Sequence, residues 1–161
     1  MKIELYHQHG VELLIEEDAL QKMLRSVARD PTLEAGGILL GRKKAGSACY
    51  CITDVGTPGI LDRRGPLFFV RSRISAEKLV TRAWKKSGGT VNHIGEWHSH
   101  PFPSPLPSGQ DRRDMERAYR EGEVLFPHFF TLIVSADFRI FVGLAERGKI
   151  IDSQIIKTGG L

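Results

Sequence analysis

The chain has 161 residues, of which 41% are hydrophobic and 26% charged, and its formal net charge is +4. This length and composition fit a globular domain with an ordinary hydrophobic core and exclude a disordered chain. The longest apolar stretch, 129–134, is far shorter than the ~20 residues that cross a bilayer. Because residues 1–10 also lack the apolar region of a secretory signal, we expect a cytoplasmic protein without a membrane partner.

The N-terminal third predicts strands around one amphipathic helix. Short strands are expected at 2–6 and 11–15. Apolar residues at i, i+4 spacing predict a helix over 16–29, which an Asp-Pro pair ends. Glycines flank a short apolar strand at 38–40, and 48–55 has the pattern of its antiparallel partner.

The middle of the chain predicts a loop, a helix and a strand. Residues 56–66 are rich in glycine, proline and charge and indicate a loop. Ser75 is the expected N-cap of a helix that reaches Ser87, with a glycine after it. Residues 91–98 have the pattern of a strand.

The C-terminal part begins with a stiff connector, because 101–107 contains four prolines. A helix is expected over 108–121, followed by strands at 129–135, 138–145 and 149–156. No repeat or linker divides the chain. The irregular order of elements therefore predicts an α/β fold: a single domain over residues 1–161, with a mixed central β-sheet flanked by helices.

The most informative residues lie around the connector. His98 and His100 are two apart on a predicted strand, so both imidazoles leave the same face. Asp111 follows in the first turn of the next helix, and the proline-rich connector limits how the chain can return to the histidines. Two imidazoles and one carboxylate suit Zn²⁺ and leave a fourth position open, which is the pattern of a catalytic site.

Each of these residues also has a plainer interpretation. A His-x-His pair alone is a weak signal, and the chain has another at His7 and His9. Ser108 and Asp111 could form only an N-cap with an acid at the third helical position. The combination of histidines, connector, serine and aspartate favours the metal site over these alternatives.

This combination resembles a known family. His98-Ser99-His100-Pro101, followed by Ser108 and Asp111, resembles the JAMM motif of the MPN-type (Mov34-like) zinc metallopeptidases. The segment that begins Glu34-Ala-Gly-Gly-Ile-Leu-Leu-Gly resembles the early strand of that family, and the two segments together look most like stand-alone bacterial members. The resemblance implies the MPN fold, which is similar to cytidine deaminases, and zinc held by His98, His100 and Asp111.

The resemblance also implies catalytic roles. Glu34 would be the general base that takes a proton from the water activated by zinc, and Ser108 would stabilise the developing oxyanion. The residues alone do not single out Glu34, because Glu96 lies two residues before His98 and faces the same way on a regular strand. Glu96 therefore remains a rival for the base or a residue that orients a ligand.

The implied activity is that of a zinc isopeptidase, deubiquitinase-like in mechanism, that deconjugates a ubiquitin-like or otherwise conjugated bacterial protein, including in anti-phage defence. The expected partners are a protein substrate with an extended C-terminal tail or isopeptide conjugate, and proteins of a conjugation pathway. Segment 56–73 could hold such a tail by strand addition, or could be an ordinary loop and edge strand. A non-catalytic scaffold and a nucleic-acid-associated JAMM-like protein are the alternatives; no aromatic stripe accompanies the basic pairs, so nucleic acid is not an expected partner.

Overall fold

A computed structural model describes residues 1–121 and 125–159 and contains a large mixed β-sheet with three helices. The sheet has eight strands in the order β1-β2-β4-β3-β7-β8-β9-β10. These strands are β1 (Lys2–Gln8), β2 (Val11–Glu16), β3 (Gly36–Lys43), β4 (Cys49–Val55), β7 (Asn92–Ser99), β8 (His128–Val134), β9 (Arg139–Glu146) and β10 (Lys149–Lys157). The helices are α1 (Glu17–Arg29), α2 (Arg73–Lys86) and α3 (Gly109–Glu121). The expected α/β class with a mixed central sheet is confirmed.

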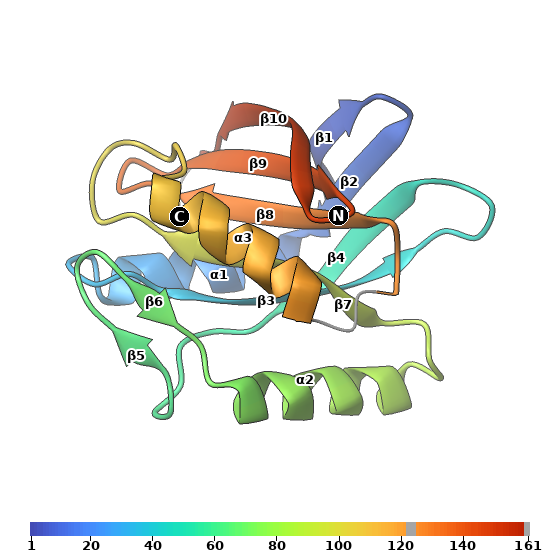
Figure 1. The fold of residues 1–161 in the computed structure, drawn as a ribbon, viewed down its shortest axis with the longest axis horizontal. Coiled ribbons are helices and arrows are strands. Elements are labelled where there is room, and N and C mark those ends of the chain that lie inside the picture. The colour runs from blue at the N-terminus through green and yellow to red at the C-terminus, as the bar shows by residue number, and fades with distance from the viewer. Residues whose placement is uncertain (122–124, 160–161) are drawn as a thin grey trace.

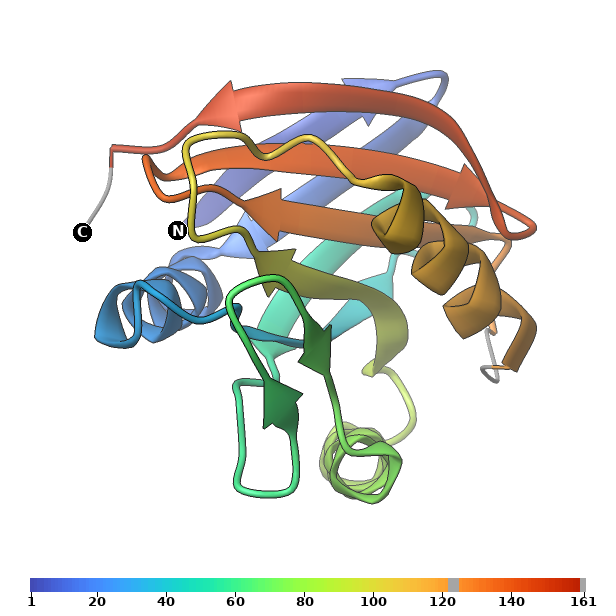
Figure 2. The same cartoon turned by 60° about the vertical axis from the view of Figure 1, so that its left-hand side comes forward.

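The sheet is strongly curved, as Figures 1 and 2 show. Strand β2 runs parallel to β4 and β7 runs parallel to β8, whereas the other neighbouring strands are antiparallel. The curvature brings the two outer strands, β1 and β10, close enough for the Tyr6 hydroxyl to donate to a carboxylate oxygen of Asp152 at 2.5 Å. Side chains thus join the two edges of the sheet.

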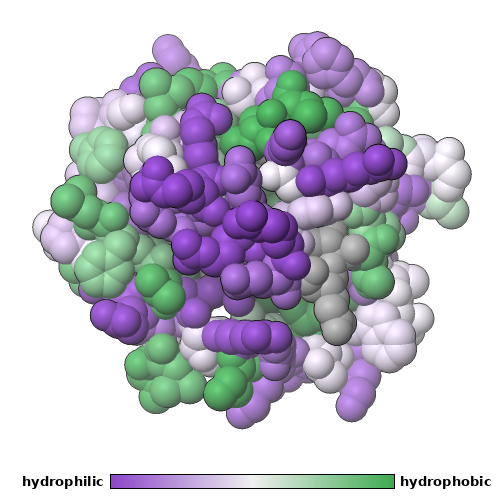
Figure 3. All heavy atoms as spheres, in the orientation of Figure 1, coloured by the Kyte–Doolittle hydropathy of each residue, from purple (hydrophilic) through white to green (hydrophobic). Residues whose placement is uncertain are grey.

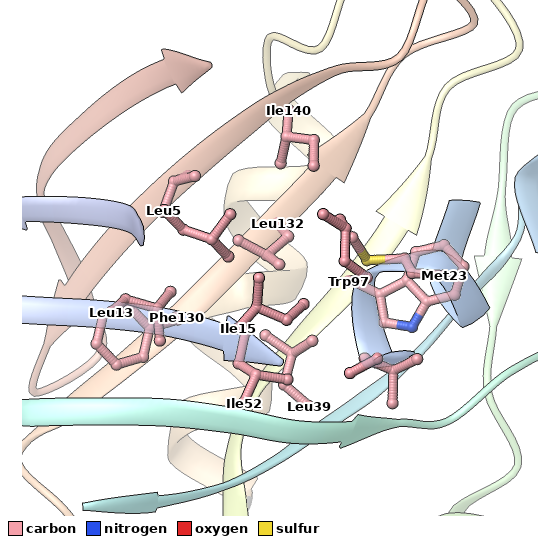
Figure 4. Close-up of a cluster of buried hydrophobic side chains, with 14 of the residues drawn as sticks. Leu5, Leu13, Ile15, Met23, Leu39, Ile52, Trp97, Phe130, Leu132 and Ile140 are labelled. Carbon is pink, nitrogen blue, oxygen red and sulfur yellow. The ribbon is translucent and has the colours of Figure 1, made fainter. Parts of the chain in front are cut away.

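The main hydrophobic core lies between one face of the sheet and α1. Met23 of α1 is fully buried, and Figure 4 shows it beside Trp97 of β7. The Trp97 indole N–H donates to the Gly56 carbonyl oxygen at 2.8 Å, so the buried ring has no unpaired donor. Helix α2 covers the opposite face around Ile38 and Leu40, in a smaller cluster. Successive residues of β7 therefore face different layers, with Trp97 in the main core and its neighbours on the α2 side.

Two local expectations need correction. The N-cap of α2 is Ser72, whose hydroxyl accepts from the backbone N–H of Ser75, so the helix begins one turn earlier than the apolar pattern suggested. Residues 56–66 are not all loop, because β5 (Arg63–Arg64) pairs with β6 (Phe69–Val70) in a separate two-stranded hairpin. Such short strands show no periodicity that a sequence pattern could reveal. Among the described helices, none is long and apolar enough to cross a membrane.

Candidate metal site and catalytic cleft

Strand β7 places the two histidines at the end of the central sheet. His98 pairs with Gly36 of β3 on one side and with Ile133 of β8 on the other. Beyond the strand, the backbone N–H of His100 donates to the Val134 carbonyl oxygen at 2.8 Å, which extends the β8 contact by one position. His98 and His100 are therefore held on a rigid part of the sheet, on the face away from the main core.

Helix α3 brings Asp111 to the histidines through a capping box. The backbone N–H of Asp111 donates to the Ser108 hydroxyl oxygen at 3.0 Å, and the backbone N–H of Ser108 donates to Asp111 Oδ2 at 2.8 Å. The plain capping interpretation and the metal-site interpretation thus describe the same two residues. The cap fixes the carboxylate of Asp111 in the orientation that faces the imidazoles.

Each carboxylate oxygen of Asp111 lies close to one imidazole nitrogen, and the possible ligand atoms of the three side chains lie within 4.8 Å of one another. Asp111 Oδ1 lies 3.3 Å from His98 Nε2, and Asp111 Oδ2 lies 3.1 Å from His100 Nε2. Ligands bound tetrahedrally to zinc at 2.0–2.2 Å would lie about 3.3 Å apart. His98 Nε2 is buried and has no hydrogen-bond partner among the described residues, despite its closeness to Asp111. A buried nitrogen without a partner is costly, and a metal ion held by these three residues would satisfy it.

His100 is held in the tautomer that suits a ligand. Its Nδ1 lies 2.9 Å from the Ser104 carbonyl oxygen, which can only accept, so Nδ1 carries the proton and Nε2 is left to bind a metal. The Phe102 ring stacks on the imidazole with centroids 4.7 Å apart and an interplanar angle of 21°. His100 is 3% exposed, so the connector fully encloses this ligand.

Without a metal, the three groups form an ion-paired cluster. Burial lowers the pKa of His100, but its hydrogen bonds to Asp111 and to the Ser104 carbonyl outweigh burial, so its pKa is raised overall. Burial likewise opposes ionisation of Asp111, yet the hydrogen bond from His100 and the electrostatic attraction of the nearby His98 hold the pKa of that carboxyl far below its usual range. Asp111 is therefore a carboxylate at any physiological pH, as a metal ligand must be.

Glu34 lies beside this cluster because of backbone pairing just before β3. The Ser99 backbone N–H donates to the Ala35 carbonyl oxygen and the Ala35 N–H donates to the Ser99 hydroxyl oxygen, both at 2.8 Å. On the other side, the Glu34 N–H donates to Gly65, and Arg64 Nε donates to the Glu34 carbonyl oxygen at 2.8 Å. Glu34 is 5% exposed, and burial raises the pKa of its carboxyl to about 7, although His98 and His100 act against that rise.

Glu96, the rival base, also lines the cleft but is already paired. Its Oε1 accepts from Arg71 Nε at 3.1 Å and from Arg71 Nη2 at 2.7 Å. As expected from the strand period, Glu96 and His98 lie on the same face of β7. The guanidinium compensates the charge of Glu96, whereas Glu34 has no such cationic partner among the described residues other than the histidines of the site.

These residues open into one cleft of about 500 Å³. Glu34, His98, Ser108 and Asp111 lie on its wall, together with the hairpin residues 67–71. The Ser108 hydroxyl oxygen accepts from Asp111, so its hydrogen is available to donate into the cleft. Part of segment 56–73 therefore borders the cleft, which is compatible with both interpretations considered for it.

Sequence reasoning missed three residues that shape the cleft. Arg71 compensates Glu96, Arg64 holds the backbone of Glu34, and Phe69 packs over Gly36, where an added Cβ would lie 2.5 Å from the Phe69 ring. Arginines in a segment rich in charge carry no signal that separates them from solvated surface residues. Their roles depend on the way the hairpin folds back over β3 and β7.

Several curated bacterial proteins are similar to this chain. A CD-NTase/cGAS isopeptidase of Pseudomonas aeruginosa is 38% identical to this chain over 90 residues, 56% of each chain. A Vibrio cholerae protein of the same name is 34% identical over 86 residues, 53% of this chain and 54% of that protein. The chain thus spans about half the length of these curated relatives. A probable metalloprotease of Sinorhizobium fredii is 29% identical over 116 residues, 70% of this chain and 69% of that protein.

The fold and the family follow from two further matches. The solution structure of a Desulfitobacterium hafniense protein has the same fold, with a TM-score of 0.57 and 22% identity over 89% of this chain and 88% of that one. Residues 16–142 match the family described as prokaryotic homologs of the JAB domain. This range includes Glu34, both histidines, Ser108 and Asp111. The chain belongs to the prokaryotic JAB-domain family, of the JAMM/MPN type.

Proposed function

We propose that this protein is a zinc-dependent isopeptidase that hydrolyses a peptide or isopeptide bond next to the C-terminal tail of a conjugated protein. One observation carries the proposal: the possible ligand atoms of His98, His100 and Asp111 lie within 4.8 Å of one another, at a cleft whose wall also includes the buried Glu34. Three protein ligands leave a position for water or substrate, which distinguishes a catalytic site from a structural one.

His98, His100 and Asp111 would hold the zinc ion, and when bound, the ion would polarise the scissile carbonyl and lower the pKa of a bound water to about 7. Glu34 would accept the proton of the attacking water and pass it to the leaving amine, a role suited to a carboxyl with a pKa of about 7. The Ser108 hydroxyl would donate to the developing oxyanion from the rim of the same cleft.

The hairpin supplies a place for an extended substrate tail. The Gly65 N–H donates to the Phe68 carbonyl oxygen, so these two residues form a hydrogen-bonded pair. Hydrogen-bonded and non-hydrogen-bonded pairs alternate in an antiparallel ladder. The next pair, Arg64 and Phe69, is therefore non-hydrogen-bonded, and its backbone N–H and C=O groups point away from the hairpin. Phe69 can therefore pair with an added strand from its free edge. Because Phe69 lies on the cleft wall, a substrate tail paired with it would run towards the proposed metal ligands.

The surface around the hairpin suits a protein partner. Exposed hydrophobic residues gather there, whereas hydrophilic residues cover α3, and Figure 3 shows this contrast on one face. An apolar patch of this kind commonly marks an interaction site. The exposed large apolar residues of segment 56–73 are Ile60, Leu61, Leu67, Phe68 and Val70, and Ile74 follows at the start of α2. The name of these relatives, CD-NTase/cGAS isopeptidase, supports a protein conjugate as the substrate. Proteins of a conjugation pathway in the same bacterium would be the partners.

Two measurements on purified protein test the proposal. Metal analysis should find one equivalent of zinc, which His98→Ala should lose, and a protein fused or conjugated through its C-terminal tail should be cleaved only by the zinc-loaded chain. A chain that binds zinc at His98 but cleaves no candidate conjugate would refute the enzymatic proposal. A chain that binds no metal at all would favour the non-catalytic scaffold.

A further inference from the structure

The turn between β8 and β9 contacts the connector, residues 101–107, which joins the two histidines to Asp111 of the proposed metal site. The Ala136 backbone N–H donates to the Phe102 carbonyl oxygen at 3.0 Å, and Arg139 Nη2 donates to the Pro103 carbonyl oxygen at 2.6 Å. Arg139 is the first residue of β9, so its guanidinium extends from a rigid strand across to a segment 36 residues earlier in the chain. No local sequence pattern requires this contact.

The guanidinium is itself fixed by the turn. Arg139 Nε donates to Asp137 Oδ2 at 2.9 Å, and the other oxygen of Asp137 accepts from the Ser135 hydroxyl. Ser135 also accepts from the Arg139 backbone N–H at 3.2 Å. The guanidinium is thus held at two points, at Nε by Asp137 and at Nη2 by the Pro103 carbonyl oxygen of the connector.

The contact at Pro103 adjoins the group that orients His100. The next residue, Ser104, supplies the carbonyl oxygen that receives His100 Nδ1–H, and the Ser104 backbone N–H donates to Phe102. The preceding residue, Phe102, stacks on the His100 ring. Holding the Pro103 carbonyl thus restrains both neighbours that fix the imidazole, one by stacking and one by a hydrogen bond.

We propose that Arg139 is a positioning residue for the metal centre, which acts through the Pro103 carbonyl to hold the His100 imidazole in its ligand orientation. This inference rests on the proposed metal site. Groups that orient a metal-ligating histidine typically change metal affinity by 10–100-fold, and Arg139 acts one step further out. Arg139 is 34% exposed, so its ion pair with Asp137 adds little to the stability of the fold as a whole.

The test compares zinc affinity with stability in the full chain. Arg139→Gln should weaken zinc binding about tenfold in competition with a chromophoric chelator, while the melting temperature of the metal-free protein changes by less than about 3 °C. Arg139→Lys, which keeps one donor, should recover part of the affinity. The matched control is Arg73→Gln, since Arg73 is an exposed arginine of α2 whose one ion pair within residues 1–121 and 125–159 is with Glu77 of the same helix. That control should bind zinc like the wild type.

Several outcomes would overturn the inference. One is a zinc affinity of Arg139→Gln within about twofold of that of the wild type. Another is an equal loss of zinc affinity in the control Arg73→Gln. A third is a loss of zinc affinity that is matched by an equally large loss of stability in the metal-free protein. If Arg139→Gln does not fold, Asp137→Asn decides, because it frees the guanidinium and should weaken zinc binding about threefold. A wild-type chain that binds no zinc through His98 would refute the metal centre itself, and this inference with it.

Discussion

Replacing Glu34 with glutamine should make the metal-free protein more stable and the enzyme inactive. The carboxyl is 5% exposed and its pKa is raised from 4.5 to about 7, mainly because burial disfavours the charged form. Glutamine has nearly the same shape but never ionises. The fold favours the neutral form of Glu34, whereas proton abstraction requires the charged form. Such a conflict between stability and catalysis is typical of catalytic residues.

The size of the effect follows from the shift. Below about pH 4.5 the carboxyl is neutral in both the folded and the unfolded chain, so Glu34→Gln should change stability little. As the pH rises, the unfolded chain loses this proton first, and the folded state is destabilised until the pH passes about 7. Each pKa unit corresponds to about 1.4 kcal/mol, so the variant should gain roughly 3 kcal/mol in free energy of unfolding near pH 8.

Urea unfolding of the metal-free protein near pH 4.5, 6 and 8 measures this gain in free energy of unfolding. In the zinc-loaded variant, turnover should fall by about 10²–10⁴-fold while zinc stays bound. The matched control is Glu96→Gln, which removes the charge of a carboxylate that already accepts two bonds from Arg71. It should lose stability and keep turnover. A Glu34→Gln variant with no pH-dependent gain would refute the burial argument, and an active Glu34→Gln beside an inactive Glu96→Gln would assign the base to Glu96.

Three other predictions concern the metal, the substrate and the sheet. His98→Ala should weaken zinc binding by more than about 100-fold in chelator competition, since it removes a direct ligand; unchanged affinity would place the metal elsewhere. Phe69→Pro should raise KM for a conjugate while Phe69→Leu does not, because only proline removes the backbone N–H at the free edge of β6; equal effects would argue against strand addition. Gly95→Ala should cost about 3 kcal/mol in urea unfolding, because its Cβ would lie 2.2 Å from the Phe130 carbonyl oxygen; a small change would show that the sheet adjusts there.

Much of the metal site could be predicted because its signals are local. His98 and His100 share a face through the two-residue strand period, and Asp111 follows at the start of a helix after a connector stiffened by prolines. Periodicity and capping patterns act over a few residues, so they are visible in one sequence. The same patterns located the helices and the long strands of the sheet, apart from the one-turn error at Ser72.

The choice between Glu34 and Glu96 depended on contacts between distant parts of the chain. By strand period alone Glu96 was the equal of Glu34, but it is the hairpin that places Arg71 against Glu96 and leaves Glu34 buried without such a partner. Burial and charge compensation depend on long-range register, which no local pattern encodes. The sequence by itself thus determined which groups could bind a metal, whereas only the tertiary structure decided which carboxyl is buried and which is paired with an arginine, because those contacts join segments far apart in the chain.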